Sequence, residues 1–140
     1  MTTSWRAITR LTAWLDERDS ISDRGESTAL RILKLSEEVG EVAEAYDGYA
    51  GRKPHKDMAR QILKLTQKAG KAVRAYIGYT GQNPRKGFTH TKHDVLEELT
   101  DVAVTALVAM ESLAPLEAEA VFQKRIERLC ERVQWKSERE

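Results

Sequence analysis

The chain has 140 residues, which is about the size of one domain and enough to bury a core. Hydrophobic residues make up 41% and charged residues 32%, with only three prolines, a composition that excludes a disordered chain and favours a helical one. The net charge of +1 gives no reason to expect a nucleic acid polymer or an acidic membrane as partner. No apolar run approaches the roughly 20 residues of a membrane span, and the single Cys130 cannot form an internal disulfide, so we expect a cytoplasmic protein without membrane contact.

Apolar residues recur at three- and four-residue steps along most of the chain, as in amphipathic helices, and alternating β-type patterns are absent. A polar loop covers residues 19–25, and Ser27 or Thr28 is a candidate cap for the helix that follows. Glycine and proline predict breaks over residues 47–54, beginning at Asp47-Gly48, and again over 78–87. Helices are expected over about residues 4–16, 28–46, 56–77 and 92–113, and from Pro115 onward.

The second of these helices should bury an apolar face. Its buried residues are expected to include Leu30, Leu33, Val39, Val42 and Tyr46. The pattern as a whole predicts a single all-α domain, a bundle of about five helices spanning residues 1–140.

An internal repeat lies within this bundle, because residues 31–56 align without a gap on residues 61–86. The apolar residues and the glycine-proline turn recur in both copies, but the charges do not. Where the first copy has Glu37, Glu38, Glu41 and Glu44, the second has Gln67, Lys68, Lys71 and Arg74.

The second copy is therefore expected to pack as the first does, but not to bind a cation as the first would. A solenoid needs about three or more similar units, so two copies do not predict a repeat array. Natural duplication followed by drift and deliberate duplication with reversed charges both fit the pattern. The replacement of acids by bases over eight residues, with the turn unchanged, favours the second origin.

Two acidic clusters stand out, and each contains a pair of carboxylates at i,i+3: Glu38 with Glu41, and Glu98 with Asp101. On a helix this spacing places both side chains on one face. The simplest interpretation is two solvated faces. Against it, both clusters lie in strongly apolar helices with few bases at i±4, and packed carboxylates repel unless a cation compensates them. Oxygen ligands of this kind suit Mg²⁺.

These motifs, Glu37-Glu38-x-x-Glu41 followed by Glu98-x-x-Asp101, resemble the signature of the MazG-like, all-α nucleoside triphosphate pyrophosphohydrolases, a superfamily that includes the dimeric dUTPases and dCTPases. Glu41 and Glu98 are separated by 56 residues, and removal of one 30-residue repeat leaves 26, which is usual for the family. The resemblance thus identifies about residues 47–76 as an insertion in a MazG-like helical bundle.

The resemblance implies that Glu38, Glu41, Glu98 and Asp101 are Mg²⁺ ligands and that Glu37 binds metal or orients the attacking water. The family hydrolyses nucleoside triphosphates between the α- and β-phosphates, which gives a nucleoside monophosphate and pyrophosphate. Family members are generally dimers or tetramers, so a homo-oligomer is expected.

Cations are expected to complete such a site by contacting the phosphates. Arg85 and Lys86 are the main candidates, and Lys34 is a further one. The first copy offers basic residues at the equivalent turn, so the choice of turn stays open: Arg52, Lys53 and Lys56. A solvated loop is the alternative for either turn.

A non-catalytic function is the competing hypothesis. Two near-equivalent helices of opposite charge could compete for one position in the bundle, which would give a structural or switching protein. Alternatively, the basic copy could pair with the acidic copy, within one chain or between chains. Such pairing would place Lys68, Lys71 and Arg74 near the carboxylates and displace the metal.

Overall fold

The computed structural model describes residues 3–21, 23–50 and 56–139, and all of its regular structure in these ranges is helical. This confirms the all-α fold and the number of helices. A helix lies in each copy of the repeat, and none of the helices in the described ranges is long and apolar enough to cross a membrane. The helices are α1 (Thr3–Arg18), α2 (Arg24–Ala50), α3 (Lys56–Thr80), α4 (Lys92–Leu113) and α5 (Ala118–Arg139).

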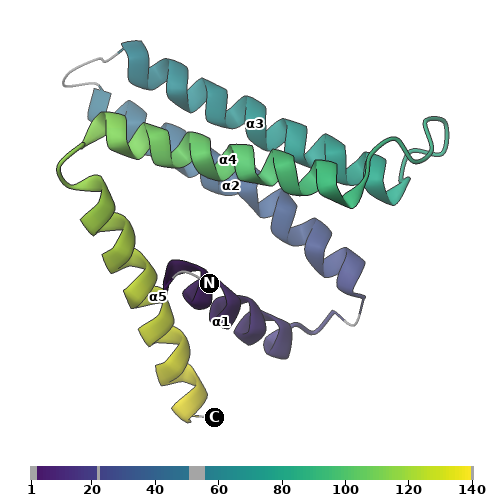
Figure 1. Ribbon diagram of the computed structural model, residues 1–140, viewed down its shortest axis with the longest axis horizontal. Helices are drawn as coiled ribbons and strands as arrows, with labels where there is room; N and C mark the ends of the chain where they lie inside the picture. The colour runs from purple at the N-terminus through teal and green to yellow at the C-terminus, as the bar shows by residue number, and fades with distance from the viewer. Residues whose placement is uncertain (1–2, 22, 51–55, 140) are drawn as a thin grey trace.

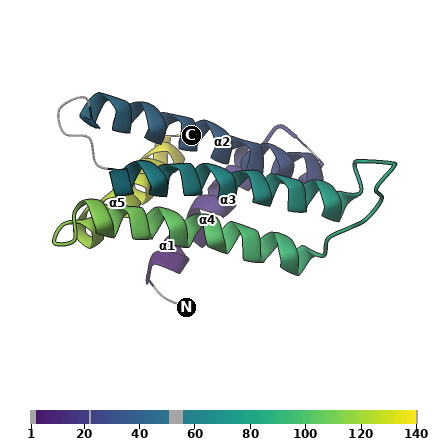
Figure 2. The same cartoon turned by 90° about the horizontal axis from the view of Figure 1, so that it is seen from above.

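Helix α3, the second copy, is the central element of the larger part of the fold. It packs along α4 more extensively than any other two helices pack, and it also packs against α2 (Figures 1 and 2). Helices α1 and α5 pack against each other as a separate pair, and α5 joins α4 through a short turn. The first copy, α2, therefore flanks the second copy.

Small residues explain why α3 approaches its neighbours closely. Ala69, Ala72 and Ala75 follow one another at three-residue steps and are almost completely buried. With Leu65 and Tyr76 they form the α3 side of two core clusters, which α2 and α4 complete with isoleucine and valine side chains. The buried partners are Ile32 and Val39 from α2, and Val95 and Val102 from α4.

The ends of α3 and α4 have clear physical causes. Gly81 adopts a φ of 66°, which a residue without Cβ tolerates and which ends α3. Thr91 caps α4: its Oγ1 accepts a hydrogen bond from the Asp94 backbone N–H, and the Asp94 carboxylate accepts one from the Thr91 N–H. This capping box fixes where α4 begins.

Helix α2 differs from its predicted limits at both ends. It begins four residues earlier, because Asp23 rather than Ser27 or Thr28 accepts hydrogen bonds from the first backbone N–H groups. The Ser27 hydroxyl is buried and donates instead to the Asp19 carboxylate. At the other end, α2 continues through Asp47-Gly48 to Ala50, so the predicted break there is wrong. The remainder of that predicted break, residues 51–54, lies outside the described residues.

The predicted burial of α2 is only partly correct. Val39 is buried and Tyr46 is half-buried, but Leu30, Leu33 and Val42 are exposed. Among the described helices, α2 packs closely only against α3, and Arg24 and Arg31 add ion pairs to Asp16 of α1. Just one edge of its apolar face is therefore covered. The amphipathic period predicts which face of a helix is apolar, but it does not indicate how many neighbouring helices cover that face.

Candidate functional site

The two acidic motifs lie at the same level of the bundle. Leu35 and Val39, beside the first motif on α2, belong to the same core cluster as Leu99 and Val102, beside the second motif on α4. Each motif is therefore held next to a common apolar core.

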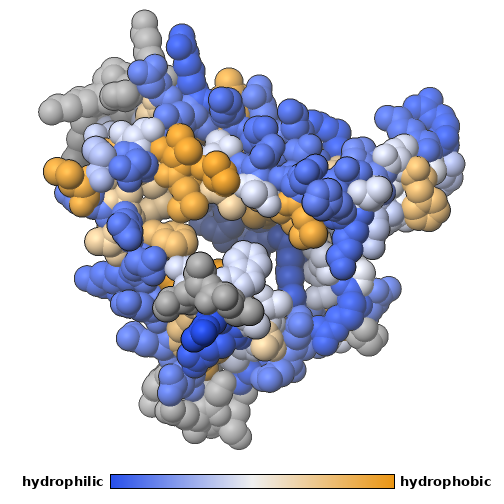
Figure 3. Space-filling model, in the orientation of Figure 1, coloured by the Kyte–Doolittle hydropathy of each residue, from blue (hydrophilic) through white to orange (hydrophobic). Residues whose placement is uncertain are grey.

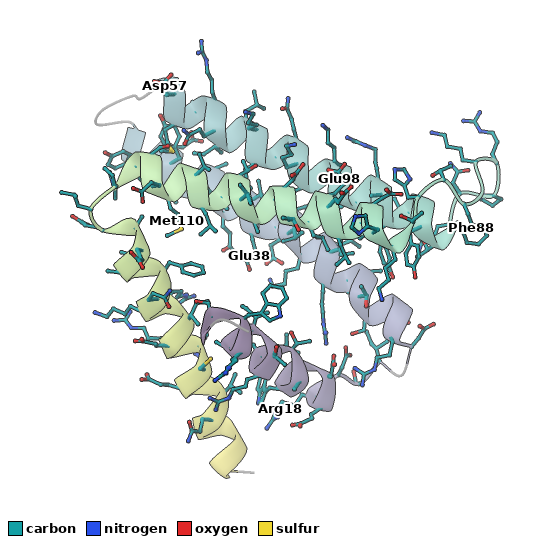
Figure 4. The ribbon with its side chains drawn as sticks, viewed as in Figure 1. Arg18, Glu38, Asp57, Phe88, Glu98 and Met110 are labelled. Atoms are coloured by element: carbon teal, nitrogen blue, oxygen red, sulfur yellow. The ribbon has the colours of Figure 1, made fainter. Side chains whose placement is uncertain are left out.

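The motifs nevertheless do not face each other. Among the described residues, no Cα atom of α2 lies within 8 Å of a Cα atom of α4, because α3 packs against both helices. Figure 4 shows Glu98 on the side of α4 that faces α3, and Glu38 on the opposite side of α4 in this view. The carboxylates of the first motif thus stay apart from those of the second.

The second motif is instead paired with the basic copy. The Lys68 ammonium lies 3.0 Å from the Asp101 carboxylate and donates a hydrogen bond to it. The side chain of Lys68 is 26% exposed and that of Asp101 is 52% exposed, so the ion pair is partly screened from solvent. In the alignment of the copies, Lys68 corresponds to Glu38. The ion pair therefore identifies the repeat position on α3 that lies beside Asp101.

The first motif has a cation of its own. The Lys34 ammonium lies 2.8 Å from the Glu37 carboxylate and 3.6 Å from that of Glu38. The hydrogen bond to Glu37 raises the pKa of Lys34 above its ordinary value. Lys34 therefore neutralises acids of its own helix in this arrangement and does not extend toward α4.

The remaining predicted ligands differ in their surroundings. Glu41 is exposed on α2. Glu98 is half-buried, and its Oε2 atom is buried without a hydrogen-bond partner within the described part of the chain. A buried carboxylate oxygen without a partner is costly, which makes Glu98 the acid most in need of a compensating group.

The carboxylates as arranged do not fit a Mg²⁺ ion. In the described ranges no three acidic, histidine or cysteine side chains come together closely enough to hold a metal. A site needs several oxygen ligands converging on one point at about 2.1 Å, whereas Glu38 and Asp101 are each paired with a lysine. The misfit follows from the position of α3.

The predicted phosphate-binding residues Arg85 and Lys86 lie in the exposed turn between α3 and α4. Backbone N–H groups of both residues donate to Asn83, which shapes the turn. The turn projects beyond the end of the bundle, where Figure 4 labels Phe88, whereas Glu98 lies further along α4. The structure does not bring these cations to the acids. The alternative turn cannot be compared, since Arg52 and Lys53 lie outside the described residues, and only the backbone of Lys56 is described.

A pocket that the sequence did not indicate opens between α2, α3 and α4 beside the motifs. Its volume is about 560 Å³, within the range of small-molecule sites. Its apolar wall includes Tyr76, whose hydroxyl donates to the Gly25 carbonyl at 2.7 Å. Basic residues of α2 and α4 also line it: Arg24, Arg31 and Lys92. These residues share no motif, so nothing in the sequence indicates that they line one pocket.

Two of these cations already have acidic partners. Arg24 and Arg31 both form ion pairs with Asp16 at the end of α1, at 2.9 and 2.8 Å. They connect the α1–α5 pair to the remainder of the fold and are only partly available to an anion.

Comparisons with known proteins do not add a family assignment. No protein-family model matches the chain, and neither does any curated protein or solved structure.

Proposed function

We propose that the chain carries the frame of a Mg²⁺-dependent nucleoside triphosphate pyrophosphohydrolase, with the catalytic motif in the first copy. The reaction is the hydrolysis of a nucleoside triphosphate to a nucleoside monophosphate and pyrophosphate. The active arrangement is one in which the first-copy helix stands where α3 stands now.

The observation that carries this proposal is the register of the Lys68–Asp101 ion pair. The copies are offset by 30 residues, so a first-copy helix in the place of α3 would present Glu38 where Lys68 now meets Asp101. Glu41 would replace Lys71 one turn further along. This register supports the proposal that the two carboxylate pairs would meet in one site if the first-copy helix lay beside α4.

Pyrophosphate release tests the proposal directly. The wild-type chain and its Lys68→Gln variant are incubated with each nucleoside triphosphate at millimolar Mg²⁺. We expect pyrophosphate and monophosphate in equal amounts. When the Glu38→Gln substitution is introduced into either chain, the release of pyrophosphate should fall to background. Glu131→Gln, which removes an exposed acid from α5 far from the motifs in sequence, is the matched control and should change nothing. If neither chain releases more pyrophosphate than its Glu38→Gln counterpart, the enzymatic proposal is wrong.

A non-catalytic switch is the second candidate, and the same ion pair favours it. Helix α3 already occupies the position next to α4, and among the described helices α2 packs closely only against α3. In this alternative the two copies exchange positions without turnover. Mg²⁺ binding without pyrophosphate release would favour the switch.

The proposal includes a homo-oligomer in the cytoplasm. Its support is an exposed apolar surface on α4 that includes Val104, Leu107 and Val108 and shows as a hydrophobic patch in Figure 3. A molar mass from light scattering equal to that of one chain would contradict the oligomer. The location rests on the free thiol of Cys130, which suits a reducing compartment.

A further inference from the structure

We infer that the pocket between α2, α3 and α4 binds a small amphipathic anion. A single aliphatic chain would lie among its apolar side chains, and one carboxylate head group would lie at its basic mouth. The inference does not rest on the proposed hydrolysis of nucleotides, because none of the carboxylates of the two acidic motifs lines this pocket.

The pocket exists because α3 separates α2 from α4. Figure 2 shows α3 between the other two helices, which have no close backbone contact with each other in the described ranges. Ile32 of α2, Tyr76 of α3 and Val95 of α4 are buried, line the pocket and belong to one core cluster. The cavity of about 560 Å³ is therefore part of the packed interior of the bundle and not a feature of a surface loop.

The walls of the pocket suit an aliphatic chain better than a nucleobase. Five of the lining side chains are aliphatic: Ile32, Leu35, Val95, Leu96 and Leu99. Two lining hydroxyl groups already donate to backbone carbonyls, that of Tyr76 to Gly25 at 2.7 Å. The hydroxyl of Thr28 donates to the Arg24 carbonyl at 2.8 Å. A base would exchange hydrogen bonds with water for an apolar wall, which is unfavourable, whereas a hydrocarbon chain gains free energy from the same transfer.

The mouth of the pocket is positively charged. Arg24, Arg31 and Lys92 line the pocket, and no acidic residue does. The two arginines form ion pairs with Asp16 of α1, which lies outside the lining. Lys92, at the start of α4, is exposed and forms no ion pair within the described part of the chain. Lys92 is therefore the cation available to the head group of an anion.

Calorimetric titration of the full-length chain with decanoate, below the concentration at which decanoate forms micelles, tests the inference. We expect saturable binding of one decanoate per chain. The affinity should fall about fourfold for each methylene group removed from the ligand, which is the ratio that corresponds to the burial of one methylene. Decanol has the same chain without the charge and should bind more weakly than decanoate.

Two substitutions of lysine test the place of the head group. Lys92→Gln should weaken the binding of decanoate about two- to fivefold, the range for the loss of one exposed ion pair, and leave that of decanol unchanged. Lys64→Gln makes the same change at an exposed position of α3 that does not line the pocket. It should bind both ligands as the wild type does.

Two substitutions of threonine test the place of the chain. Thr28→Trp introduces an indole large enough to fill the pocket and should abolish the binding of both ligands. Thr66→Trp is the matched control, because both threonine hydroxyls donate to the carbonyl four residues earlier and Thr66 does not line the pocket. Circular dichroism verifies that each variant has the helical content of the wild type.

The inference is overturned if decanoate does not bind at millimolar concentration, if its chain length has no effect, or if the two variants of either pair bind it alike. Vesicles of phosphatidylglycerol offer the same combination of acyl chain and anion at a membrane surface. The chain should not sediment with them, because the pocket is assigned to a single free chain. Sedimentation that Thr28→Trp abolishes would assign the pocket to a membrane lipid and contradict the inference.

Discussion

Helices α2 and α3 carry two copies of one sequence pattern, yet they have different places in the fold. The apolar positions recur, but Val42 of α2 is 41% exposed, whereas its counterpart Ala72 in α3 is completely buried. Likewise, Leu35 is half-buried and Leu65 is buried. The copy with the smaller residues has the central position. Periodicity alone therefore decides which face of a helix is apolar, and side-chain size decides which helix fits between two others.

The charges differ between the copies in a way that agrees with these positions. The acids of α2 lie on an exposed surface, where Lys34 and water stabilise them. The bases of α3 include Lys68, which forms an ion pair with Asp101 of α4. Each helix is compatible with its surroundings, and an exchange of the two would place acids next to acids unless a cation bound there.

The largest effect is expected from giving α3 the side chain of α2 at the most buried position. Ala72→Val should lower the free energy of unfolding by about 1–3 kcal/mol, because the close-packed interface has no room for two more methyl groups. Ala59→Val, at an exposed position of the same helix, should cost about 0.7 kcal/mol or less. Urea unfolding measures both, and equal losses would contradict the packing argument.

The two tyrosines near the end of α3 provide the next comparison. Tyr76→Phe removes a hydrogen bond to the Gly25 carbonyl and should lower the free energy of unfolding by about 0.5–1.5 kcal/mol. Tyr79→Phe changes a more exposed side chain and should have a smaller effect. A loss in the second variant that matched the first would show that the bond to α2 does not stabilise the position of α3. Thermal unfolding distinguishes the two.

Equivalent glycines of the copies should respond with opposite sign. A Cβ at Gly48 would meet nothing within 4 Å, so Gly48→Ala should raise the free energy of unfolding by about 0.5–1 kcal/mol. A Cβ at Gly78 would overlap the side chains of Thr89 and His90, so Gly78→Ala should lower it. Chemical denaturation of the two variants tests this, and a stabilised Gly78→Ala would mean that the turn after α3 packs less closely than described.

The smallest effect concerns α4, the helix that either copy would have to face. The hydrogen bond from the Thr91 backbone holds the pKa of Asp94 below its ordinary value of 3.8. The resulting stabilisation is complete above that value and is lost as the pH falls through the lower pKa of the folded protein. Asp94→Asn should therefore reduce the loss of stability on acidification below about pH 4. Urea unfolding measured as a function of pH tests this, and an acid limb identical to that of the wild type would contradict the assignment.

Local signals predicted some features well and others poorly. The limits of α4 agree with the predicted range of about residues 92–113, and its cap, Thr91, lies next to the helix in the sequence. The end of α2 was not, since Asp47-Gly48 is compatible with a helix once it lies on a solvent-exposed end. The cap by Asp23 was missed in favour of Ser27 or Thr28. The Ser27 hydroxyl instead donates to Asp19, eight residues earlier in the chain.

The candidate site was also predicted in part, with its local features correct and its neighbours left open. Spacing at i,i+3 on a helix was enough to place Glu38 with Glu41, and Glu98 with Asp101, on common faces. The sequence also identified Lys68 as a cation at an acidic position of the repeat. It offered both copies as neighbours of α4 and gave no reason to choose between them.

The amino-acid sequence by itself determined that this protein is helical, where its apolar faces lie and which charges the two copies carry, because each of these properties depends on residues within a few turns of one helix. Only the tertiary structure decided that α3 lies against α4, that Lys68 meets Asp101 and that the two acidic motifs stay apart. That choice depends on how closely two helix backbones can approach, and this is set by the volumes of alanines and valines on facing helices far apart in the sequence.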